Sequence, residues 1–278
     1  MSGVKDFRRI SGAINGCEKA GFSQVWQRNC PIIGHVLTLA LDTSSPSGSL
    51  AFLRDDKLIA VVGTSSGEMY SSRVFRHLDF LLGELSLRLE DVDLFAVAAG
   101  PGSFTGLRVG LAAVKGWAEV FGKPIAAVSA LEAIAAQSRA CTQKVISVMD
   151  ARRGEVYWAF YTRRDSERGA PLVLENDEMV GPRDEFVRAV ASGESAKEIA
   201  IATPAAEVIA DAISQIGNSG HRSQRFFVER VSPVLAPEIG RLGFLRAQSG
   251  DVVDALALDA NYIRRSDAEL HWKGPSGS

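Results

Sequence analysis

Apolar segments of strand length and apolar residues at helical spacing alternate along the first part of the chain. Three short apolar segments are separated by polar turns, which is the pattern of a three-stranded meander. Apolar residues then recur at three- and four-residue spacing between Tyr70 and Leu85, and this predicts a helix that buries one face. The predicted elements are strands at 36–41, 49–53 and 58–62, a helix at 70–85, a strand at 94–99, a helix at 103–121, a strand at 124–128 and a helix at 130–137.

The second part of the chain repeats this order. Its first apolar segment ends in Asp150, as the first segment of the chain ends in Asp42, and a returning strand follows each aspartate. The predicted elements are strands at 145–150, 155–161 and 171–180, a helix at 183–191, a strand at 198–202 and a helix at 205–216. The pattern predicts an α/β fold of two duplicated β-β-β-α-β-α halves, the first at 36–139 and the second at 140–265.

Composition limits where the chain works and what it binds. A formal net charge of −2 over 278 residues argues against a protein that binds nucleic acid through a strongly basic surface. The three cysteines are Cys17, Cys30 and Cys141, and their spacing fits neither a zinc site nor a disulfide framework. We expect a cytoplasmic protein without membrane contact, in which 1–35 is an N-terminal extension of unknown role and 266–278 is a disordered tail.

A glycine-rich loop joins the strand at 94–99 to the helix that follows it. It reads Gly100-Pro101-Gly102-Ser103-Phe104-Thr105-Gly106-Leu107-Arg108-Val109-Gly110. Ser103 or Thr105 can cap the helix, and the amides at a helix start attract anions. The loop lacks both the lysine of a P-loop and the spacing of a dinucleotide-binding fingerprint. Two interpretations stay open, a phosphate cradle and a tight turn that packs the helix closely on the sheet.

Asp42 and Asp150 are the acidic candidates for a nucleotide site. In a duplicated nucleotide-binding fold they would face a metal–phosphate complex across a cleft, although each alone is more simply explained as a cap of its own turn. The candidate residues of this nucleotide-like loop are Asp42, Gly100, Gly102, Ser103, Thr105, Gly106 and Asp150. Because no residues have the spacing of metal ligands or the setting of a nucleophile, we expect no metal site and no catalytic residue.

The helix at 103–121 is apolar on two faces. One stripe contains Phe104, Leu107, Leu111, Val114, Ala118 and Phe121, and a second holds the mostly small residues Gly106, Gly110, Ala113 and Trp117. One face covers the sheet and the other needs a neighbour, which is either the helix at 70–85 or a partner chain. The candidate partner-binding residues are Tyr70, Val74, Leu78, Leu107, Leu111 and Val114.

Several segments together resemble a known family. They are Leu39-Ala40-Leu41-Asp42-Thr43-Ser44, the glycine loop with Lys115-Gly116, Met149-Asp150-Ala151-Arg152-Arg153-Gly154-Glu155-Val156-Tyr157 and Tyr262-Ile263-Arg264-Arg265. Over residues 36–265 the chain resembles the bacterial TsaB (YeaZ) family. The resemblance implies an actin-like, Hsp70-like (ASKHA) fold of two related halves. It also implies a place in the machinery that puts threonylcarbamoyl on N6 of adenosine 37 in tRNAs that decode ANN codons.

The resemblance further implies a non-catalytic subunit and its partners. Such a subunit pairs with its catalytic paralogue TsaD through the two helices of the first half, is joined by the ATPase TsaE, and meets tRNA only through the complex. The paralogue carries a His-x-x-x-His metal motif, whereas Ala130 and Ile134 stand at the matching positions here. We therefore expect no enzyme activity and no cofactor, with residual ATP or ADP binding left open. The alternatives are an ASKHA-type phosphotransferase or ATPase that uses Asp42 and Asp150, and a homodimeric regulatory module.

Overall fold

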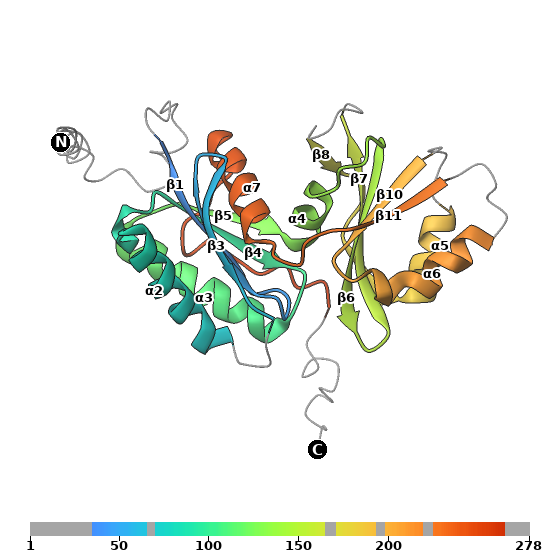
Figure 1. Ribbon diagram of the computed structural model, residues 1–278, viewed down its shortest axis with the longest axis horizontal. Helices are drawn as coiled ribbons and strands as arrows, with labels where there is room; N and C mark the ends of the chain where they lie inside the picture. Colours follow the sequence, from blue (N-terminus) through green and yellow to red (C-terminus); the bar gives the residue numbers. More distant parts are fainter. Residues whose placement is uncertain (1–34, 66–69, 165–170, 193–197, 219–224, 265–278) are drawn as a thin grey trace, which may run out of the picture. The chain divides into compact units, whose positions relative to one another are not determined.

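Two mixed β-sheets organise the described part of the chain (Figure 1). The computed structural model describes residues 35–65, 70–164, 171–192, 198–218 and 225–264. The first half contains β1 (Leu37–Asp42), β2 (Ser49–Arg54), β3 (Lys57–Gly63), α2 (Tyr70–Leu85), the 3₁₀ turn η1 (Leu89–Asp91), β4 (Leu94–Gly100), α3 (Phe104–Phe121), β5 (Ile125–Ser129) and α4 (Ala130–Ala136). The second contains β6 (Lys144–Arg152), β7 (Glu155–Arg163), β8 (Leu172–Leu174), β9 (Met179–Pro182), α5 (Arg183–Ser192), β10 (Glu198–Thr203), α6 (Ala206–Asn218), β11 (Arg225–Arg230) and α7 (Ala236–Gln248).

The two sheets share one topology, which confirms the predicted duplication. Their strand orders are β3-β2-β1-β4-β5 and β8-β7-β6-β10-β11. In each sheet the first strand of the half pairs antiparallel with the second strand and parallel with the strand that follows the first helix. β5 and β11 then extend the sheets in parallel.

Sequence periodicity missed three features of the second half. The single strand predicted at 171–180 is divided into β8 and β9, which pair with opposite ends of β7. The strand β11 and the helix α7 were not predicted. α7 contains Pro237, Gly240 and Gly243, residues of low helix propensity, so its pattern is weak although its packing is extensive.

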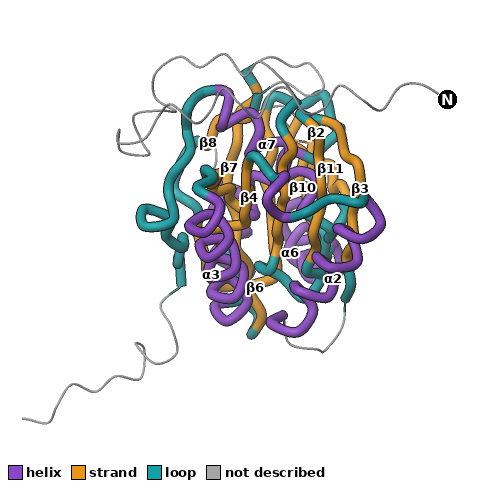
Figure 2. The backbone as a smooth tube through the Cα atoms, turned by 90° about the vertical axis from the view of Figure 1, so that its left-hand side faces the viewer, coloured by secondary structure: helices purple, strands orange, loops and turns teal. Residues whose placement is uncertain are grey.

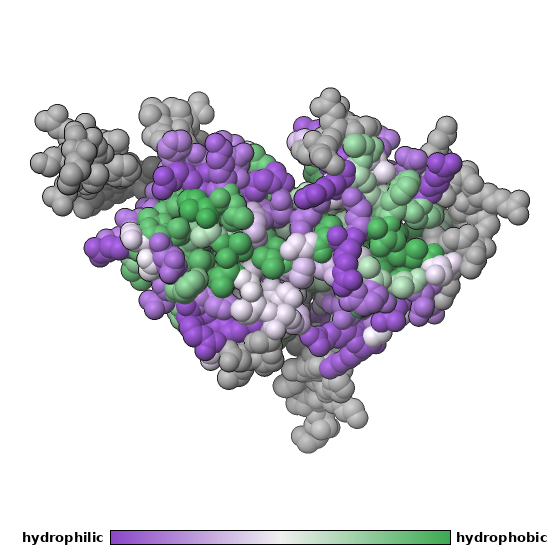
Figure 3. Space-filling view, viewed as in Figure 1, coloured by the Kyte–Doolittle hydropathy of each residue, from purple (hydrophilic) through white to green (hydrophobic). Residues whose placement is uncertain are grey.

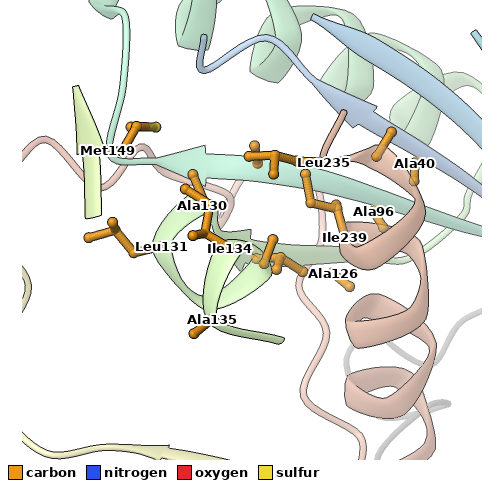
Figure 4. Packing of buried hydrophobic residues seen from close by; sticks show 14 of the residues in the cluster. Ala40, Ala96, Ala126, Ala130, Leu131, Ile134, Ala135, Met149, Leu235 and Ile239 are labelled. Atoms are coloured by element: carbon orange, nitrogen blue, oxygen red, sulfur yellow. The ribbon is translucent and has the colours of Figure 1, made fainter. Parts of the chain in front are cut away.

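The last helix of each half packs on the sheet of the other half. α7 contacts β1, β2, β4 and β5 of the first sheet, and α4 contacts β6, β7 and β10 of the second sheet as well as β4 and β5 of its own half. In Figure 4, Ile239 of α7 lies beside the small sheet residues Ala96 and Ala126, and Leu131 and Ile134 project from α4. The boundary expected between residues 139 and 140 therefore separates elements along the sequence but not in the packing.

Two further helix pairs cover the remaining faces of the sheets. α2 and α3 pack on the first sheet, where their inward residues join a core cluster around Leu39 and Phe52. Figure 2 looks from this side and has α2 and α3 in front of the strands. α5 and α6 take the matching place on the second sheet, where Phe186 packs edge-on against Trp158 with ring centroids 5.8 Å apart.

The outermost strands expose apolar side chains. Leu58 and Val61 of β3, and Phe227 and Val228 of β11, are partly open to solvent. Figure 3 shows hydrophobic areas where Figure 1 draws these two strands. The pairing of β2 with β3 shifts register between Phe52 and Leu53. Such a bulge makes an edge irregular and discourages it from pairing with a further strand.

Candidate functional site

Asp42 lies inside the fold at the end of β1. Its side chain is fully buried, and its Oδ1 accepts hydrogen bonds from the Ser44 backbone N–H at 2.8 Å and the Ser44 hydroxyl at 2.6 Å. Its Oδ2 has no hydrogen-bond partner among the described residues. Burial raises the pKa of Asp42 to about 6, against the opposing effect of the two Ser44 hydrogen bonds. The carboxylate therefore holds its own turn.

The glycine loop packs directly on this aspartate turn. The Ser103 backbone N–H donates to the Ser44 carbonyl at 2.7 Å. A Cβ atom on Gly102 would lie 2.4 Å from that same backbone carbonyl oxygen, so this position requires glycine. A Cβ on Gly110 would lie 2.3 Å from the Thr43 hydroxyl, so a larger residue there would displace the Thr43 side chain. Of the two predicted caps, Ser103 is the N-cap of α3, since its hydroxyl accepts from the Gly106 N–H at 3.3 Å.

A late segment of the chain, residues 261–264, connects the glycine loop with the β6–β7 hairpin. The Asn261 N–H donates to the Ala99 carbonyl at 2.7 Å, and the Tyr262 ring lies 4.9 Å from the ring of Phe104. The Arg264 guanidinium donates to the Ala151 carbonyl at 3.0 Å and forms an ion pair with Glu155. The chain's own backbone thus occupies space beside the strand end that leads into the loop.

Asp150 has the same place in the second half but a different environment. It is exposed, and its Oδ1 accepts from the Arg152 backbone N–H at 2.8 Å. Arg152 and Arg153 both have positive φ angles, 63° and 55°, which are unusual for residues other than glycine. Both aspartates thus cap their own turns, as the simpler interpretation predicts, and Asp42 also lines a small pocket together with Arg73 and His77.

The positions matched to metal ligands are apolar and buried. Ala130 and Ile134 have no exposed surface and belong to the cluster between α4 and the sheets (Figure 4). Within the described ranges, no three His, Cys, Asp or Glu side chains gather in a way that could hold a metal ion. The helices of those ranges also lack the combined length and apolar character needed to cross a membrane.

The helix pair α2–α3 corrects the assignment of the partner-binding residues. The side chain of Tyr70 falls outside the described residues. The other five candidates, Val74, Leu78, Leu107, Leu111 and Val114, are each less than 7% exposed and form part of the chain's own core. The sequence of a helix that is apolar on two faces does not reveal which face packs on the sheet. In this structure it is the face that carries Leu107, Leu111 and Val114.

A different stripe of α3 is partly open to solvent. Val109, Ala113, Gly116 and Val120 recur at helical spacing. Val109 and Ala113 are half-buried against the core, whereas Gly116 is exposed and Val120 is 76% exposed. Trp117 lies next to this stripe and meets the exposed Phe75 of α2 edge-on, with ring centroids 6.3 Å apart. We call these six residues the α2–α3 face. The ring contact shows that α2 is the internal neighbour of α3, and no described part of the chain covers Gly116 and Val120 beyond it.

The fold defines a class of protein. Two copies of one α/β unit, with identical sheet orders and exchanged last helices, form an actin-like, Hsp70-like (ASKHA) fold. Residues 61–216, more than half of the chain, match the family model described as TsaD: tRNA N6-adenosine threonylcarbamoyltransferase.

Individual relatives agree with this match. The chain is 29% identical over 240 residues to the tRNA threonylcarbamoyladenosine biosynthesis protein TsaB of Bacillus subtilis. The matched region covers 84% of this chain and 96% of the relative. It is 33% identical over 130 residues to TsaB of Escherichia coli, 46% of this chain and 56% of that one. The solved structure of YeaZ from Pseudomonas aeruginosa superposes with a TM-score of 0.65 at 26% identity, covering 82% of this chain and 99% of that one. The chain belongs to this TsaD-type family and, within it, to the TsaB (YeaZ) group.

Proposed function

We propose that this protein is a non-catalytic subunit in the biosynthesis of N6-threonylcarbamoyladenosine in tRNA, and that it binds a TsaD-type catalytic subunit through the α2–α3 face. The names of its TsaB relatives support the pathway. The observation that carries the docking surface is the uncovered stripe of α3 beside the exposed ring of Phe75.

The chemistry of the α2–α3 face suits a helical partner. Ala113 and Gly116 are small, so another helix can approach α3 closely. Phe75, Trp117 and Val120 supply aromatic and aliphatic anchors of the kind that dominate binding energy at protein interfaces. A continuous apolar stripe on an otherwise charged surface is a common sign of an interaction site.

The partner we propose shares the fold. A model of TsaD-type proteins matches residues 61–216 of this chain, a range that includes α2 and α3. A TsaD-type subunit would therefore have its own helix pair in the equivalent place, and the two pairs would form a four-helix bundle. The apolar, buried positions Ala130 and Ile134 support the division of labour, because neither side chain can hold a metal.

The docking surface is tested by co-purification with the TsaD-type subunit of the same organism. Val120→Glu and Gly116→Glu each place a charge on the exposed stripe without touching the core, so binding should weaken about a hundredfold or more while folding is retained. The matched control is Ala210→Glu, at an exposed position of α6 in the second half. Stoichiometric co-purification of both folded variants would refute the surface.

The pathway role is tested by reconstitution of tRNA modification. We expect a mixture with TsaD and TsaE but without this chain to leave N6 of adenosine 37 unmodified. Wild type and Ala210→Glu should restore modification, and Val120→Glu should not. We expect TsaE and tRNA to join only through the assembled cytoplasmic complex. Tight binding of Mg–ATP to the isolated chain, with hydrolysis lost in Asp42→Asn, would instead favour the phosphotransferase alternative.

A further inference from the structure

A cleft of about 610 Å³ lies between the two halves, away from the α2–α3 face. It is lined by the carboxyl ends of β4 and β5, by α4 and α7, and by β7, β8 and the segment after β8. The lining elements α7, α4 and β8 are labelled in Figure 1. Its volume falls in the range of sites that enclose small organic molecules.

The charged groups of the cleft are unequally paired. Three carboxylates, Glu132, Asp177 and Glu178, line it together with a single cation, Arg246. Arg246 is held by Glu132 at 2.5 Å, and its guanidinium also donates to the Ala127 carbonyl. Burial raises the pKa of Glu132 in spite of this pairing.

Glu178 accepts hydrogen bonds from neutral donors, and the charge of Arg246 favours its ionised form to a smaller extent. It accepts from the Ser129 hydroxyl, and its Oε2 accepts from the Asn261 amide at 2.7 Å. Burial is the largest cause of the raised pKa of Glu178, and the charge on Glu132 raises it further. A cation beside Glu178 would supply the compensation that these neutral groups give only in part.

Tyr161 provides a second, independent sign of a ligand. Its side chain lines the cleft and is only 2% exposed. Its hydroxyl lies near the hydroxyls of Ser129 and Ser147 but forms no well-aligned hydrogen bond among the described residues. Burial and the nearby carboxylates Glu178 and Glu132 raise the pKa of Tyr161, so the phenol stays protonated and neutral. A buried hydroxyl without a partner is uncommon in folded proteins.

We propose that this cleft binds a small organic cation, a primary ammonium group on a short aliphatic chain. An ammonium group donates three hydrogen bonds and accepts none. The Glu178 carboxylate, the Tyr161 hydroxyl oxygen and the carbonyl oxygen of the Asn261 side chain are three acceptors that can receive them. Leu172, Leu174 and Ile263 provide the apolar wall against which the aliphatic chain packs. This site goes beyond the proposed scaffold function and does not depend on it.

The test is a calorimetric titration of the isolated full chain with n-hexylamine, 1-hexanol and hexanoate, which share a six-carbon chain and differ in charge. The amine should bind saturably, the alcohol should bind at least about tenfold more weakly, and the acid should not bind. Glu178→Gln should lower the affinity for the amine about tenfold. Glu175→Gln is the matched control, because Glu175 pairs with Lys144 outside the cleft lining.

A second variant separates lost binding from lost folding. Leu174 is 43% exposed, so Leu174→Trp fills the cleft from its rim without disturbing the core. This substitution should lower the affinity for the amine while the thermal unfolding curve stays unchanged. Equal affinity for the amine and the alcohol, or unchanged affinity in Glu178→Gln, would overturn the proposal. Because the titration involves no partner, its failure would leave the co-purification result untouched.

Discussion

The two halves of this protein have one topology but present different outer helix pairs to solvent. α5 and α6 expose charged side chains, among them Asp184, Glu185, Arg188, Glu207 and Asp211. α2 and α3 also carry surface charges, but between them they expose Phe75, Phe80 and Val120. Because the second half folds with a charged outer face, the architecture itself does not require an apolar one. The fold therefore does not account for the apolar stripe of the first half, which the proposed partner would explain.

The largest expected effect distinguishes the core stripe of α3 from its exposed stripe. Leu111→Asp buries an unpaired carboxylate and removes a packed leucine, and should lower the free energy of unfolding by about 5 kcal/mol or more. Val120→Asp, at an exposed position of the same helix, should change it by less than about 0.5 kcal/mol. Urea denaturation measures both values. Equal losses would mean that the two stripes are not distinct.

The next effect compares the two aspartates. Between about pH 4 and pH 6 the folded chain keeps the proton of Asp42, whose pKa is raised from 3.8 to about 6, while the unfolded chain releases it. Stability is therefore lost as the pH rises through this window, by about 3 kcal/mol in total. Asp42→Asn should remove that dependence. The free energy of unfolding of the variant, relative to that of the parent, should therefore rise from pH 4 to pH 7.

Asp150→Asn is the control for this experiment because Asp150 is the exposed counterpart in the second half. Its unfolding free energy should follow that of the parent over the same pH range. Parallel pH profiles of Asp42→Asn and the parent would contradict the buried, ionisable state of Asp42.

A smaller effect is expected where the glycine loop packs on the Asp42 turn. The first half has Gly100-Pro101-Gly102 after its strand, and the second half has Thr203-Pro204-Ala205 at the matching place. Gly102→Ala installs the alanine of the second half, and its Cβ would meet the Ser44 carbonyl oxygen. We expect a loss of about 2 kcal/mol by thermal unfolding. An unchanged unfolding temperature would show that the two loops are interchangeable.

The smallest effect concerns the surface of α3. No atom lies within 4 Å of a Cβ built on Gly116, so Gly116→Ala meets no clash. Alanine should stabilise the isolated chain by about 1 kcal/mol, because glycine loses more conformational freedom in a helix. If the partner's helix packs closely at this position, co-purification should weaken even as stability rises. If both stability and co-purification increase, the closest contact with the partner's helix is not at Gly116.

Much of the fold followed from the sequence, and the site followed less well. Strand-length apolar segments and the aspartates that end them predicted the duplication, because each half repeats the same local pattern. The exchange of α4 and α7 depends on contacts between residues more than a hundred positions apart, such as Glu132 with Arg246, which no local pattern encodes. The α2–α3 face was missed for a similar reason. Leu111 and Val120 are both aliphatic, and only the position of the sheet decides which of them is buried.

The exchanged helices also bear on how such a chain could arise. A single β-β-β-α-β-α-β-α unit would leave bare the sheet face that the last helix of the other half covers, and its own last helix would lose its contacts with the other sheet. In two copies whose last helices exchange places, each last helix covers the sheet of the other copy. This is the geometry of a domain-swapped dimer. We expect either half, expressed alone, to be unstable as a monomer and to associate with a second copy of itself.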